Sequence, residues 1–146
     1  EALAAADIAY DPELVLEGNW LPSSGYEHTN ALMRLAEPPT AIFSANDRMA
    51  VGCYEALKEL GLRIPQDVSV VGYDDDEVAR HLSPQLTTLL LPHRGMGKWA
   101  VEQALAQGGE VQDKYQVIKL ECPLIERESI GAPRQGRRPR RPKGQH

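Results

Sequence analysis

The chain has 146 residues, 42% hydrophobic and 25% charged, which is typical of one folded domain and excludes collagen-like, mucin-like and wholly disordered chains. Its formal net charge of -5 is uneven: the six Arg and Lys of residues 131–146 leave 10 of the 16 basic residues against all 21 acidic ones in residues 1–130. A body this acidic is not itself a nucleic-acid surface, which needs clustered Lys and Arg.

Hydrophobic periodicity and turn residues divide the chain into alternating strands and helices. In chain order the pattern predicts strand 13–17, helix 26–36, strand 40–45, helix 48–60, strand 68–72, helix 74–82, strand 87–91, helix 95–107, strand 115–120 and strand 123–127. Such alternation predicts an α/β fold, a parallel sheet with helices on both faces. The expected parallel strands are those that contain Val15, Ile42, Val70 and Leu89.

Capping residues place the ends of two of these helices. Ser23 or Ser24 can cap the helix over residues 26–36, and Asp47 is the expected N-cap of the helix that follows it in the chain. Gly61 is the expected C-terminal cap residue of that second helix.

Three side chains stand where predicted strands end. Trp20 follows residues 13–17, Asn46 follows residues 40–45, and Asp74 follows residues 68–72. Ligands of open parallel sheets bind beyond the carboxyl ends of the strands. An aromatic face, an amide and a carboxylate that accepts from two hydroxyls suit a polyhydroxylated neutral ligand such as a sugar, and we expect Trp20, Asn46 and Asp74 to bind it.

Structural roles are open for the same three residues. Trp20 can anchor a loop or the core, Asn46 can be a turn residue that leads into the helix, and Asp74 can cap a helix. Their shared position at strand ends is what favours a common binding site.

Catalytic and metal chemistry find no support in the sequence. The acidic residues 74–77 lack the glycine and distal glutamate of a calcium loop, and a solvated helix start explains them. The four histidines stand in no zinc-binding motif, and no nucleophile elbow is present. The two cysteines, Cys53 and Cys122, form no disulfide framework and favour a reducing compartment. We therefore expect no enzyme activity, no metal and no cofactor, and no membrane partner, since no run of 18 apolar residues exists.

Two stretches resemble a known family. Residues 39–50 read PTAIFSANDRMA and residues 61–75 read GLRIPQDVSVVGYDD, with SPQLTT at 83–88 and PLIER at 123–127. These motifs resemble the effector-binding domain of LacI/GalR-type transcriptional repressors, and the likeness spans nearly all of residues 1–130. Periplasmic sugar-binding proteins share part of it, so a secreted binding protein of a transporter is the alternative.

The resemblance implies a C-terminal piece of a two-lobed, periplasmic-binding-protein-like domain. Residues 10–90 and 115–130 would form the C-terminal lobe, and the helix over residues 95–107 would belong to the other lobe, most of which is missing. A helix-turn-helix head, absent from this chain, would bind operator DNA in the cytoplasm, with lobe closure on the effector controlling that binding.

The resemblance also implies roles for individual residues of this chain. Trp20, Asn46 and Asp74 match effector-contacting positions of sugar-responsive members, and Val51, His81 and Leu82 match positions near the interface of a homodimer. Leu91 departs from the pattern, because many members have a polar residue there that reaches the pocket.

The basic tail over residues 131–146 lies beyond the family's closing strand. Its six cations with Pro and Gly predict a disordered, solvated segment, with contact to DNA phosphates as the alternative.

Overall fold

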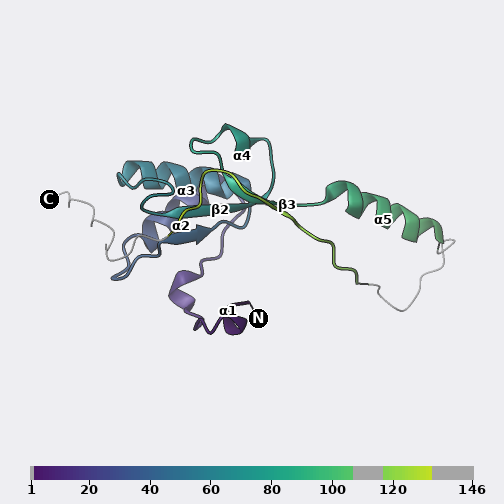
Figure 1. The fold of residues 1–146 in the computed structure, drawn as a ribbon, viewed down its shortest axis with the longest axis horizontal. Helices are drawn as coiled ribbons and strands as arrows, with labels where there is room; N and C mark the ends of the chain where they lie inside the picture. Colours follow the sequence, from purple (N-terminus) through teal and green to yellow (C-terminus); the bar gives the residue numbers. More distant parts are fainter. Residues whose placement is uncertain (1, 107–116, 133–146) are drawn as a thin grey trace.

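The computed structural model describes residues 2–106 and 117–132 (Figure 1). In chain order the elements are α1 (Ala2–Ala5), the 3-10 helix η1 (Pro12–Leu14), α2 (Pro22–Leu32), β1 (Ala41–Phe43), α3 (Asp47–Glu59), β2 (Ser69–Asp74), α4 (Val78–His81), β3 (Thr87–Leu90), α5 (His93–Ala106) and β4 (Leu124–Ile125). None of the helices among these residues is long and apolar enough to span a bilayer.

The strands form one sheet in the order β1-β2-β3-β4. β1 pairs with β2 and β2 with β3 in parallel, so that Ile42 lies opposite Val70 and Tyr73 opposite Leu89. This confirms the α/β fold and the parallel strands around Ile42, Val70 and Leu89. β4 pairs with β3 in the antiparallel direction, because the segment before it, from residue 117 on, runs back toward the sheet from the side to which α5 projects (Figure 1).

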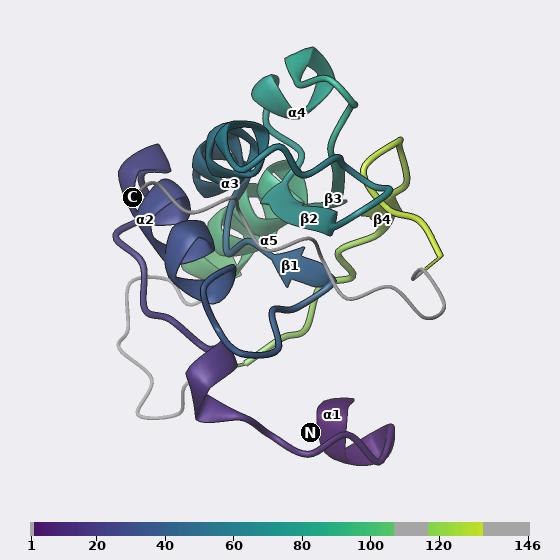
Figure 2. The same ribbon diagram turned by 90° about the vertical axis from the view of Figure 1, so that its left-hand side faces the viewer.

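The core lies between the sheet and α3, with α2 packed against α3 on the same side (Figure 2). Its fully buried side chains include Leu57, Val68, Val70 and Leu86. The opposite face of β1 is open, since Ala41 and Phe43 are exposed. The described residues thus cover one face of β1, where the sequence predicts helices on both.

The predicted strand over residues 13–17 is wrong. Pro12 instead begins a 3-10 turn, which Asp11 caps by accepting a hydrogen bond from the Glu13 amide at 2.9 Å. Val15 and Leu16 remain 56% and 40% exposed. In the described sheet residues 13–17 pair with no strand, so their backbone groups lack the ladder bonds that define one.

The predicted helix caps are partly wrong. α2 begins at Pro22, whose missing N–H suits a first helical position, and its N-cap residue Leu21 makes no side-chain bond, so neither Ser23 nor Ser24 caps it. α3 is capped by Asn46 rather than by Asp47, which is its first residue. Gly61 ends α3 as predicted, with a φ of +69 that favours glycine.

The C-terminal strands are shorter than predicted. The predicted strand over 115–120 has no strand structure at 117–120, and its first two residues lie outside the described part. The predicted helix over 74–82 shortens to α4. Of the tail, residues 133–146 also lie outside the described part.

Ser129, in the segment after β4, is fully buried and forms hydrogen bonds to two strands of the sheet. Its hydroxyl accepts from the Thr87 amide at 2.8 Å and donates to the Val70 carbonyl at 2.6 Å. Its own carbonyl accepts from the Val70 amide at 2.9 Å. Ser129 therefore joins the beginnings of β2 and β3.

Candidate functional site

The carboxyl edge of the sheet brings the three predicted ligand residues together. β1 and β2 run in parallel, so Asn46, just after β1, and Asp74, the last residue of β2, lie at the same edge. The Asn46 amide nitrogen donates to the Trp20 carbonyl at 3.2 Å, which fixes the loop before α2 at this edge as well. The Trp20 side chain is 63% exposed.

Asn46 has a structural role in addition to its position at the edge. Its Oδ1 accepts from the Met49 amide at 2.8 Å, which caps α3, and the residue is 8% exposed. Asn46 is therefore the residue that leads into α3, as its structural alternative predicts, and it also takes the N-cap position that the sequence assigned to Asp47. An amide offers two N–H groups and two lone pairs, so one donor and one acceptor position remain for a ligand.

Asp74 does not cap a helix. α4 starts four residues later, and its N-cap residue Glu77 makes no side-chain capping bond. Asp74 has a φ of +122, a conformation that residues other than glycine rarely adopt. Burial raises the pKa of its carboxyl, an effect opposed by His93 and reinforced by Asp76. Its carbonyl accepts from the Leu91 amide at 3.3 Å.

Asp47 is a central residue that the sequence patterns assign only to helix capping. It is fully buried and accepts from the Thr88 hydroxyl at 2.6 Å and from the Asp76 amide at 2.8 Å. A Cβ at Gly72 would lie 2.1 Å from its Oδ1, so only glycine fits there. Burial raises the pKa of Asp47, and its two hydrogen bonds oppose that rise. Asp47 thereby joins α3, β3 and the turn after β2.

Asp75 stabilises the same turn through ion pairs with two arginines. Its carboxylate, 8% exposed, binds Arg127 at 2.5 Å and Arg80 at 3.2 Å. Arg127 also donates to the Leu86 carbonyl at 2.8 Å. Burial alone would raise the pKa of Asp75, but hydrogen bonds and charges from Arg127 and Arg80 outweigh burial and hold it below its ordinary value. Sequence patterns gave no signal for this pair, because its partners lie 52 residues apart.

The acidic turn is not arranged for a metal ion. The Asp75 carboxylate is paired with arginine, and that of Asp76 accepts from the Glu77 amide at 2.6 Å. Across residues 2–106 and 117–132, no group of three or more His, Cys, Asp or Glu side chains could hold one.

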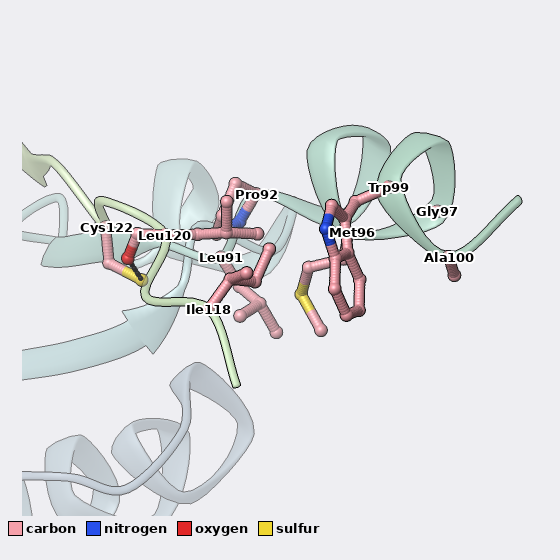
Figure 3. Close-up of a pocket in the computed structure, with 9 residues that line it drawn as sticks. All are labelled: Leu91, Pro92, Met96, Gly97, Trp99, Ala100, Ile118, Leu120 and Cys122. Carbon is pink, nitrogen blue, oxygen red and sulfur yellow. Dashed lines mark hydrogen bonds between the residues drawn. The ribbon is translucent and has the colours of Figure 1, made fainter. Parts of the chain in front are cut away.

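A separate apolar cavity of about 560 Å³ lies at the base of α5 (Figure 3). It is lined by Leu91 and Pro92 before the helix, Met96 and Trp99 on it, and Ile118 and Cys122 on the returning segment. Figure 1 shows α5 projecting away from the sheet, and its Leu105 is 77% exposed. Leu91, where the family pattern has a polar residue, thus faces an apolar space.

Val51, His81 and Leu82 line one groove of about 730 Å³ between α3 and α4. Tyr54 and Lys58 of α3 line it too. The structure therefore brings together the three residues expected at a dimer interface.

Comparisons with known proteins agree with this architecture. A model of the periplasmic binding protein-like domain matches residues 2–130. The ribose operon repressor of Haemophilus influenzae is 41% identical over 129 residues, covering 88% of this chain and 39% of that protein. The HTH-type transcriptional repressor PurR of Photorhabdus laumondii is 38% identical over 130 residues, which are 89% of this chain and 38% of that repressor.

Among solved structures, the transcriptional regulator CelR in complex with cellobiose superposes with a TM-score of 0.79 at 36% identity. The match covers 88% of this chain and 39% of that one. The chain thus spans about two fifths of the length of these three relatives.

The Asp75 ion pairs make a testable contribution to stability. We expect Asp75→Asn to lower the free energy of unfolding by about 3 kcal/mol near neutral pH, because it leaves the guanidinium of Arg127 buried without its partner. Since the pKa of Asp75 is lower in the folded chain than in the unfolded one, this contribution is present above about pH 4 and is lost as pH falls through the folded value.

Urea denaturation of the chain and the variant at several pH values checks this. The difference in stability should stay constant between about pH 7 and 5 and shrink toward about pH 3. Glu102→Gln is the control, because the Lys98–Glu102 pair is exposed and its loss should cost under about 0.5 kcal/mol. An Asp75→Asn effect no larger than that of the control would contradict the assignment.

Proposed function

The chain belongs to the LacI family of transcriptional regulators and carries part of its periplasmic binding protein-like domain, and we propose that it binds the sugar or related polyol that controls such a regulator. The relatives that it matches are transcriptional repressors, not enzymes. The observation that carries the proposal is the shared edge of Trp20, Asn46 and Asp74, with the Asn46 amide bonded to the Trp20 carbonyl.

The chemistry of this edge suits a neutral ring with several hydroxyls. The exposed indole of Trp20 offers an apolar face on which the C–H face of a pyranose can lie. The Asp74 carboxylate can accept from two hydroxyls, and the spare N–H of Asn46 can donate to a third oxygen. The cellobiose complex of CelR, one of the similar structures, supports a sugar as the ligand class.

In the full-length regulator, a helix-turn-helix head outside this chain would bind operator DNA in the cytoplasm. Residues 10–90 and 115–130 would form one lobe, and the helix 95–107 would pack on the other. The outward position of α5 and the apolar cavity at its base support this division (Figures 1 and 3). An effector that binds the closed arrangement more tightly shifts the lobes by its differential affinity, and thereby controls operator binding.

Calorimetric titration of the full-length protein with a panel of sugars, ribose and cellobiose among them, and of nucleobases tests the proposal. We expect a sugar to bind. Asp74→Ala should cost about 1.5–3 kcal/mol of binding, the range for hydrogen bonds to a charged group, and Trp20→Ala should weaken binding through loss of apolar cover.

Glu77→Gln is the matched control, because Glu77 follows on the same acidic stretch but is exposed and its side chain makes no capping bond. The proposal fails if folded Asp74→Ala and Trp20→Ala proteins keep the parental affinity, or if nucleobases bind and sugars do not.

We also propose that the groove between α3 and α4 is where a second copy of the protein docks. It gathers Val51, His81 and Leu82 on one surface, and homodimers of DNA-binding proteins match the two half-sites of an operator.

Leu82→Asp should convert the full-length dimer to a monomer in sedimentation, since the dimer would bury an unpaired charge at this position. Deletion of residues 131–146 should leave the dimer mass and operator selectivity unchanged; a monomer after that deletion would assign assembly to the tail instead.

A further inference from the structure

The backbone of Trp20 is held in an unusual conformation. Its φ is +67, in the left-handed region that favours glycine, and its side chain is 63% exposed. An exposed tryptophan gains little from burial, so packing does not stabilise this conformation. Strained residues persist only where their surroundings hold them in place, and they cluster at ligand sites.

Side-chain hydrogen bonds on both sides of Trp20 hold it. Asn19 Oδ1 accepts from the Leu21 amide at 3.0 Å, which closes a turn around Trp20. The Ser24 hydroxyl accepts from the Asn19 amide at 3.1 Å and donates to the Leu21 carbonyl at 3.1 Å. Asn46 adds the bond to the Trp20 carbonyl.

Ser24 is a fixed point for this network. It is 5% exposed and lies in the first turn of α2, the helix that packs against α3. The neighbouring Gly25 shows how close that contact is, because a Cβ there would lie 2.0 Å from the Met49 carbonyl oxygen. The loop from Asn19 to Leu21 is therefore bonded to a part of α2 that cannot shift. All of these bonds use the backbone of the loop, and none uses the indole.

We propose that Asn19 and Ser24 are positioning residues for effector binding, which hold the Trp20 backbone in its left-handed conformation and so present the free indole face at the carboxyl edge of the sheet. This inference rests on the proposed function and extends it to two residues that do not themselves touch the sugar. It explains why a tryptophan occupies a backbone position suited to glycine: the loop is shaped by its hydrogen bonds, and the indole is left for the ligand.

Fluorine NMR of the full-length regulator labelled with 5-fluorotryptophan tests the positioning without any ligand. The Trp20 resonance is the one that disappears in Trp20→Phe. We expect Asn19→Leu, at an exposed position that leaves the core intact, and Ser24→Ala to shift and broaden this resonance. Asn19→Asp keeps the acceptor oxygen and should restore the parental signal, and Ser23→Ala is the matched control, because exposed Ser23 makes none of these bonds.

Calorimetry on the same variants uses the tightest-binding sugar of the panel, with ribose and cellobiose as the first probes. Asn19→Leu and Ser24→Ala should weaken binding about fivefold to tenfold, as expected for one lost hydrogen bond, with Asn19→Asp and Ser23→Ala within about twofold of the parent. An unchanged Trp20 resonance in Asn19→Leu, or a changed resonance with unchanged affinity, overturns the inference. A parent that binds no sugar overturns the proposed function instead, and the resonance alone then decides whether Asn19 and Ser24 order Trp20.

Discussion

The buried carboxylate of Asp47 makes the contacts on which the geometry of the carboxyl edge with Trp20, Asn46 and Asp74 depends. It lies at the first turn of α3, yet both of its partners come from elsewhere in the chain, the Thr88 hydroxyl of β3 and the Asp76 amide after β2. The absence of a side chain at Gly72 lets the carboxylate approach the sheet. An ionised carboxylate without exposed surface is costly unless hydrogen bonds satisfy it, so these partners cannot leave without loss of stability. Asn46 directly precedes Asp47, and Asp74 lies two residues before Asp76. The hydrogen bond between Asp47 and the Asp76 amide therefore holds Asn46 and Asp74 at the same edge of the sheet.

The other contacts that hold this part of the sheet come from Arg127 and Ser129, near the end of the described chain. Arg127 binds Asp75, the residue after Asp74, and Ser129 joins the beginnings of β2 and β3. The turn that carries Asp74 is thus held by α3 on one side and by the segment that returns from α5 on the other.

Sequence reasoning found the parts of this architecture that depend on local pattern. Alternation of strands and helices predicted the parallel sheet around Ile42, Val70 and Leu89, and the ends of two of its strands predicted the edge that carries Asn46 and Asp74. Trp20 lies at this edge although the strand predicted before it does not form, because the Asn46 amide bonds to its carbonyl. Sequence reasoning did not predict the features that depend on contacts between residues distant in the chain. The segment at Val15 has strand composition but no neighbour to pair with, and β4 is antiparallel because of the path by which it returns. Asn46 and Asp47 are equally good caps by residue type, and only the buried partners of Asp47 decide between them. Sequence patterns gave Ser24 only as a helix cap and gave no signal for Asn19, because their bonds form around a left-handed backbone at Trp20 that no pattern indicates.

Amide hydrogen exchange at Asp76 tests the central role of Asp47 most directly. In the parent, the Asp76 N–H is bonded to the Asp47 carboxylate at 2.8 Å and should exchange slowly. In Asp47→Ala we expect exchange at Asp76 to accelerate at least about tenfold, equivalent to about 1.4 kcal/mol of lost protection, while the amides of β2 that bond to β1 stay as slow as in the parent. Unchanged exchange at Asp76 in a folded Asp47→Ala protein would show that the turn is held without Asp47 and would contradict this account.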